Sequence, residues 1–137
     1  MTRVLRRTAF ATVLVAAFGV ASAEDVSVKL TGAEETPAVT TSATGEGKIT
    51  IGKDMSVKGS VKTKGITGTA AHIHEAPLGK AGPPVITLTK SGDDTWTVPD
   101  GSKLTEEQYK AFKDGNLYVN VHSAEHKPGE IRAQLKP

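Results

Sequence analysis

The chain has 137 residues, with 17 lysines and arginines, 15 aspartates and glutamates, four histidines and no cysteine. This length is enough for one domain with its own hydrophobic core. The lack of cysteine excludes disulfides, thiolate metal sites and thiol catalysis, so any bound metal must be held by imidazole and carboxylate groups.

The N-terminal segment has the three parts of a secretory signal peptide. Three arginines precede an apolar run over residues 9–20, and a small-x-small cleavage pattern ends at Ala23. The apolar run is shorter than the roughly 20 residues of a membrane-spanning helix. We therefore expect residues 1–23 to be a signal peptide and residues 24–137 to form a mature domain with no membrane span. The expected location is periplasmic or secreted.

Removing the predicted leader changes the charge balance. The leader holds three of the 17 basic residues and none of the 15 acidic ones, so the mature chain carries about one net negative charge. Its aromatic residues are few: Trp96, Tyr109, Phe112 and Tyr118. These features argue against nucleic acid as a partner, because a nucleic-acid-binding domain needs a basic patch in its mature form.

Eight short stretches of the mature chain are typical of β-strands, with Gly, Pro, Asp and Ser between them. They cover residues 26–32, 47–54, 55–65, 69–76, 83–92, 94–101, 117–123 and 129–136. The second and third stretches are predicted to form a hairpin, and residues 34–47 a polar loop or edge connection. Short strands with turn signals about every ten residues favour an all-β fold, namely an antiparallel Greek-key sandwich or barrel of about eight strands.

One segment, residues 103–116, breaks the strand pattern. Thr105 precedes two glutamates, Tyr109 and Phe112 are three residues apart, and Gly115 follows them. Threonine suits a helix N-cap, acidic residues suit the first turn, and glycine suits the position after the last turn. We therefore predict a short helix of two to three turns that plugs one end of the β domain.

All four histidines fall in two short stretches, AAHIHEA and NVHSAEHKPGE. Residues i and i+2 of a strand point to the same face, so His72 and His74 project together. On the later strand, His122 lies on the more solvated face, opposite the apolar side chains. If both strands belong to one sheet, three imidazoles converge on one surface, and His126 in the following loop is a candidate fourth ligand.

Three or four imidazoles without thiolate favour Cu(II) or zinc. We therefore expect a metal site, with copper as the metal and zinc as the alternative, whose candidate ligands are His72, His74, His122 and His126. The second ring nitrogen of each ligand needs a carboxylate, carbonyl or water partner, for which nearby candidates are Glu75, Asn120, Glu125 and Glu130. The competing interpretation is that these histidines are ordinary solvated side chains of surface strands.

Four segments carry a resemblance to a known family: AHIHEA, GKAGPPV, LYVNVHS and PGEIRAQL. Together they resemble the CHRD family, a module of chordin and of bacterial exported proteins. The resemblance spans about residues 26–135, and it implies that residues 24–137 form one CHRD domain.

The same segments are similar, more distantly, to copper-zinc superoxide dismutase, an eight-stranded Greek-key barrel with copper on its outer face. This resemblance implies that His72, His74 and His122 bind copper and that Arg132 guides a small anion such as superoxide. His126 has no clear counterpart there. The chain lacks the cysteines and the further histidines of that family's disulfide and zinc subsite, so the resemblance implies copper alone.

The expected function is that of an exported copper-binding protein with superoxide dismutase-like activity. The alternatives are a redox-inert copper or zinc binder and an extracellular interaction module without catalysis. For Arg132, a surface ion pair with Glu130 competes with the guidance of an anion, because the two residues are i and i+2 on one predicted strand. The sequence leaves open whether the domain forms a homodimer.

Overall fold

The computed structural model describes residues 13–14 and 22–137. The predicted signal peptide, residues 1–23, lies almost entirely outside this part of the chain, so it stays a prediction. Among the described residues, no helix is long and apolar enough to cross a membrane.

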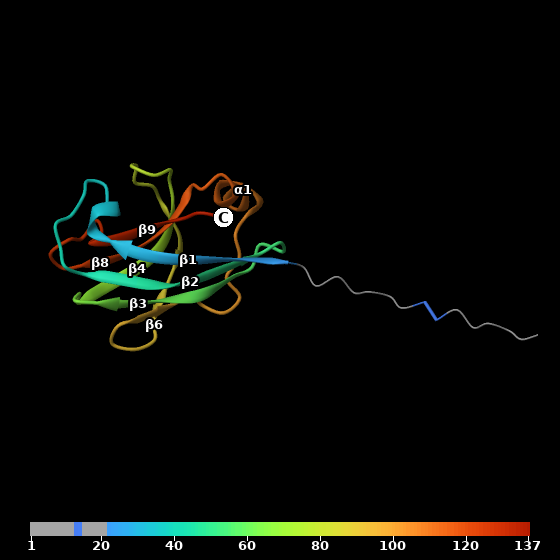
Figure 1. The fold of residues 1–137 in the computed structure, drawn as a ribbon, viewed down its shortest axis with the longest axis horizontal. Coiled ribbons are helices and arrows are strands. Elements are labelled where there is room, and N and C mark those ends of the chain that lie inside the picture. Colours follow the sequence, from blue (N-terminus) through green and yellow to red (C-terminus); the bar gives the residue numbers. More distant parts are fainter. Residues whose placement is uncertain (1–12, 15–21) are drawn as a thin grey trace, which may run out of the picture.

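Within the described residues, nine antiparallel strands form one sheet that curls into a nearly closed barrel (Figure 1). The strands are β1 (Ala23–Thr31), β2 (Thr44–Gly52), β3 (Val57–Lys64), β4 (Gly68–Glu75), β5 (Pro84–Thr87), β6 (Thr89–Lys90), β7 (Thr95–Thr97), β8 (Leu117–Ser123) and β9 (Ile131–Leu135). Their order in the sheet is β5-β4-β8-β9-β1-β2-β3-β7-β6. The predicted all-β barrel with one short helix is confirmed, and the predicted strand over residues 83–92 is divided into β5 and β6.

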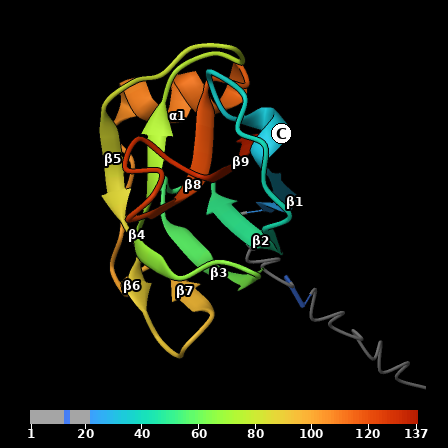
Figure 2. The same ribbon diagram turned by 90° about the vertical axis from the view of Figure 1, so that its left-hand side faces the viewer.

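A single segment joins the two ends of the sheet. β5 and β6 lie at opposite ends of the strand order, yet only Leu88 separates them in the chain. The backbone N–H of Leu88 donates to the carbonyl of Ala71 in β4 at 2.9 Å, while β6 pairs with β7. Figure 2 shows this segment running down one side of the barrel. The segment β5–Leu88–β6 therefore nearly closes the barrel and leaves little open edge to pair with another chain.

The first hairpin shows how alternation in the sequence becomes a two-faced sheet. β1 pairs with β2 along its whole length, from Ala23 opposite Gly52 to Thr31 opposite Thr44. Val26, Val28 and Leu30 point into the core, and the residues between them face outward. β2 begins three residues earlier than the predicted strand, so the end of the segment predicted as a polar loop is paired strand.

The predicted helix is present as α1 (Glu106–Lys113), at one end of the barrel (Figure 2). The Thr105 side chain accepts from the Gln108 backbone N–H at 3.1 Å, and the Gln108 side chain accepts from the Thr105 backbone N–H at 2.9 Å. Gly115 has a φ of 76°, a left-handed conformation that ends the helix at little steric cost. Phe112 is fully buried in the core and Tyr109 is partly buried against it, as a plug requires.

The neighbouring strands β4 and β8 set up the surface that carries the histidines. Ile73 on β4 and Val119 on β8 are opposite each other and fully buried. The residues between the core positions face the other side of the sheet, where His74 is opposite Tyr118 and His72 is opposite Asn120. Because the strands pair in this register, side chains 50 residues apart in the chain share one small patch.

Candidate metal centre

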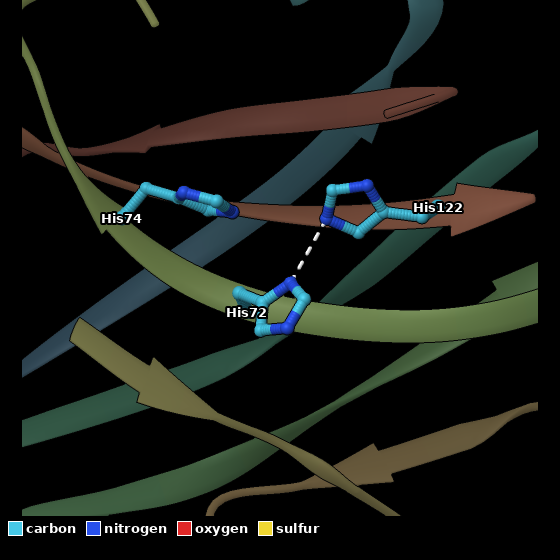
Figure 3. A group of neighbouring side chains, drawn as sticks. All are labelled: His72, His74 and His122. Carbon is cyan, nitrogen blue, oxygen red and sulfur yellow. Dashed lines mark hydrogen bonds between the residues drawn. The ribbon is translucent and has the colours of Figure 1, made fainter. Parts of the chain in front are cut away.

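The structure brings three of the four histidines together on the outer side of β4 and β8. One ring nitrogen from each of His72, His74 and His122 lies within 4.8 Å of the other two. Figure 3 shows the rings facing one another, two from β4 and one from β8. Among the described residues, these three side chains form the one group of three or more potential ligands that could hold a metal ion.

The spacing of the rings is close to what one ion needs. His72 Nδ1 and His122 Nε2 are 2.9 Å apart, and the His74 ring centroid is 5.2 Å from that of His72 and 5.8 Å from that of His122. Imidazole nitrogens lie about 2.0–2.1 Å from a zinc ion, so two nitrogens on one such ion are separated by roughly 3–4 Å. The three ring nitrogens, within 4.8 Å of one another, are therefore close to the separation that one ion requires.

Backbone carbonyls determine which nitrogens are available. His74 Nδ1 lies 2.9 Å from the Gly82 carbonyl, and His122 Nδ1 lies 2.7 Å from the Lys127 carbonyl. A carbonyl oxygen only accepts, so both Nδ1 atoms carry the proton and donate it, and a neutral ring then has its lone pair on Nε2. These carbonyl bonds fill the role for which acidic side chains and Asn120 were considered from the sequence.

The most buried ring of the cluster, that of His74, has one nitrogen without a hydrogen-bond partner among the described residues. His74 is only 8% exposed, and its Nε2 has no hydrogen-bond partner among the described residues. Buried polar atoms are almost always paired, so an orphaned lone pair beside two more imidazoles needs an explanation. A metal ion bound there would supply one.

Burial also favours the neutral form of the rings. Removal from water lowers the pKa of His72 below its usual value, and the neighbouring His122 and His74 lower it further. Burial likewise lowers the pKa of His74, against the opposing effect of its bond to Gly82. Only neutral imidazole binds metal, so both shifts favour the ligand form near neutral pH.

The face of β8 that carries His122 is less solvated than predicted. Tyr118 and Asn120 share this face, yet they are only 3% and 1% exposed. The loop over residues 76–83 covers Tyr118, whose hydroxyl accepts from the Gly82 N–H at 3.2 Å. Asn120 lies beneath a second loop, where its amide is 3.4 Å from the Pro128 carbonyl. The prediction that this face of the strand is solvated is therefore wrong for Tyr118 and Asn120.

Arg132 lies beneath the first of these loops, only 1% exposed. Its Nη1 donates to the Lys80 carbonyl at 2.7 Å, and its Nη2 donates to the Pro77 carbonyl at 3.3 Å. Glu130 instead accepts from the Thr41 and Ser123 hydroxyls, so the alternative of a Glu130–Arg132 surface ion pair is wrong for the described residues. Guidance of an anion by Arg132 stays a prediction.

His126 is placed apart from the other three. Its side chain lines a hollow between the loop over residues 35–40 and its own loop, together with Glu125 and Pro128. Its backbone carbonyl accepts from the N–H groups of Ser123 and Gly129 and so shapes the loop. The structure therefore does not bring His126 into the three-histidine group, and its role as a fourth ligand stays a prediction.

Sequence reasoning missed Gly82 and the role of Tyr118. A Cβ on Gly82 would lie 1.8 Å from the Glu75 carbonyl oxygen, so only glycine lets the loop lie this close to β4. The Tyr118 ring stacks on His74 with centroids 4.9 Å apart and planes 3° from parallel. The glycine before two prolines marked a turn in the sequence, but nothing local indicated what the turn contacts.

Comparison with known proteins gives one match. The family model of the CHRD domain matches residues 26–135 of the chain. No curated protein and no solved structure matches.

Proposed function

This chain belongs to the CHRD domain family, and we propose that it is an exported copper-binding protein with superoxide dismutase-like activity. The proposed ligands are His72, His74 and His122. The observation that supports this most is the buried Nε2 of His74, which has no partner in the described chain and belongs to a ring held by Gly82 beside two further imidazoles.

The donor set favours copper over other ions. A group of imidazoles without thiolate suits Cu(II), and the order of affinities for divalent metals puts copper above zinc at a given nitrogen site. Copper, when bound, would supply one-electron oxidation and reduction of a small oxygen species such as superoxide. Residues of the chain would hold the ion in place. The rings of His74 and His122 are each anchored to a backbone carbonyl, whereas the hydrogen bond of His72 is to the ring of His122.

The exposure of the ligands supports access for a small anion. His74 is buried, while His72 and His122 are part-exposed, so an ion on this group would have one side toward solvent. Guidance of the anion by Arg132 rests on the resemblance to superoxide dismutase.

The burial of Arg132 supports a second candidate, a redox-inert copper or zinc binder. Both terminal nitrogens of the guanidinium already donate to oxygens of the chain itself. A guanidinium held in this way is not free to attract superoxide, which favours a protein that binds metal without catalysis.

Export is the part of the proposal that rests on residues 1–23 alone. Their charged start, apolar run and small residues before Glu24 are the parts of a signal peptide. Expression of the full chain in a bacterium should yield protein outside the cytoplasm with Glu24 as its first residue, measured by intact mass. A cytoplasmic product of full length would contradict export.

The first experiment is a Cu(II) titration of the purified protein followed by electron paramagnetic resonance. We expect one tight equivalent with a nitrogen-rich tetragonal spectrum that disappears in His74→Ala and persists in the control His126→Ala. A superoxide decay assay on the loaded protein, compared with the same concentration of free copper, then separates the candidates. Tight binding without decay would leave the redox-inert binder, and no stoichiometric binding would leave an interaction module.

A further inference from the structure

Arg132 is a buried cation whose placement has a visible consequence. The guanidinium group stays protonated in proteins, and burying a charge is costly unless hydrogen bonds compensate it. Among the described residues no carboxylate forms an ion pair with it. Its two terminal nitrogens donate to the carbonyls of Lys80 and Pro77 and to the side-chain oxygen of Gln134, at 2.7, 3.3 and 3.0 Å. Its Nε has no hydrogen-bond partner among the described residues. Arg132 therefore fastens the loop over residues 76–83 to the barrel.

That loop orients one candidate ligand. Gly82 accepts from His74 Nδ1 through its carbonyl and donates to the Tyr118 hydroxyl through its N–H, at 2.9 and 3.2 Å. Gln134 holds the start of the same loop by donating to the Ala76 carbonyl at 2.8 Å. The position of the Gly82 carbonyl, and with it the proton on His74, therefore depends on how the loop is held.

A second path runs through the aromatic ring of Tyr118. The guanidinium carbon of Arg132 lies 3.5 Å from the ring centroid, and the His74 ring stacks on Tyr118 with planes 3° from parallel. Planar cations stack well on aromatic faces. The plane of His74 is therefore set by a ring that Arg132 itself holds.

We propose that Arg132 is a positioning residue for His74. Through the loop over residues 76–83, it keeps the proton of His74 on Nδ1. Through the Tyr118 ring, it fixes the plane of the His74 ring so that the Nε2 lone pair faces His72 and His122. Only the consequence for metal binding rests on the proposed function, because the proton position is a property of the metal-free protein.

The test is therefore made without metal, by long-range proton–nitrogen NMR of the histidine rings. The wild-type protein should show His74 protonated at Nδ1. Arg132→Lys keeps the charge but loses the planar fork and the stacking, and it should give a mixture of both tautomers at His74. His122 should keep its Nδ1 proton in the same sample, because the Lys127 carbonyl that accepts it belongs to another loop.

Val61→Ala is the matched control, because Val61 is fully buried in β3, away from the loop, and its truncation lowers stability alone. A destabilised Arg132→Lys protein that keeps the wild-type His74 tautomer would overturn the proposal and leave Arg132 a purely structural residue. If that variant does not fold, Gln134→Ala at a part-exposed position removes one acceptor of Arg132 and the bonds to the carbonyls of Ala76 and Gly115. An unchanged tautomer there would overturn the proposal equally. Failure of copper binding would leave this measurement unaffected.

Discussion

His72 and His122 face each other across two neighbouring strands, with Nδ1 of the first 2.9 Å from Nε2 of the second. His122 already carries its proton on Nδ1, where it donates to the Lys127 carbonyl, so a neutral His122 accepts at Nε2 and His72 donates. In the metal-free protein, one proton therefore lies between the two nitrogens that would both bind the ion. Metal binding at these two nitrogens would displace this proton.

Because the site is formed by the folded barrel, metal should stabilise the protein. Copper at 100 times its dissociation constant is expected to raise the free energy of unfolding by about 2.7 kcal/mol. For a domain of this size, that corresponds to a rise in melting temperature of roughly 10 °C. Scanning calorimetry with Cu(II), and again after removal by a chelator, measures the effect. An equal rise in His74→Ala would place the bound metal elsewhere.

Gly82→Ala should weaken metal binding, because its Cβ would meet the Glu75 carbonyl oxygen and push the loop away from His74. Loss of a bond that orients a ligand typically lowers metal affinity 10- to 100-fold, and the collision should cost about 1–3 kcal/mol of stability. Isothermal calorimetry and urea unfolding measure the two effects.

Gly79→Ala in the same loop is the control for that variant. Gly79 has a φ of 82°, which an alanine tolerates poorly, but an added Cβ there meets nothing within 4 Å. Its stability should fall by about 1 kcal/mol with metal affinity retained. Equal losses of affinity in both variants would show that the orientation of His74 does not depend on Gly82.

The stability of the metal-free protein should decrease as the pH falls below about 6.5, the usual pKa of histidine. The folded state lowers the pKa of His72 and of His74, chiefly by burial, so the unfolded chain binds more protons below this pH. Their contribution is therefore complete above pH 6.5 and is lost as the pH falls through the folded pKa values. Urea unfolding between pH 5 and 8 measures the slope. His72→Gln/His74→Gln should flatten it, and an unchanged slope would contradict the role of these rings.

The stability that α1 contributes by closing one end of the barrel should depend on the buried side of the helix. Phe112 is fully buried in the core, so Phe112→Ala should cost about 3–5 kcal/mol. Tyr109 is only partly buried three residues earlier on the same helix, and Tyr109→Ala should cost clearly less. Urea unfolding of both variants makes the comparison. Equal losses would mean that the helix does not plug the barrel through Phe112.

Several features of this protein follow from short-range pattern alone. Alternation along β4 predicted that His72 and His74 share a face, and alternation along β8 predicted that His122 lies opposite the buried valines. Thr105 and Gly115 marked the ends of α1. These signals are readable because strand periodicity and helix capping depend on neighbours within a few residues.

Other features required the tertiary structure. The segment around Leu88 joins two edges of the sheet, and no residue near it indicates that the edges meet. Arg132 and Tyr118 have the alternation of outward-facing strand residues, yet the loop over residues 76–83 covers them and makes them the support of His74. Sequence alone therefore determined which side of each strand a side chain occupies. What covers that side was decided by loops that arrive from tens of residues away, through contacts that leave no periodic trace in the chain.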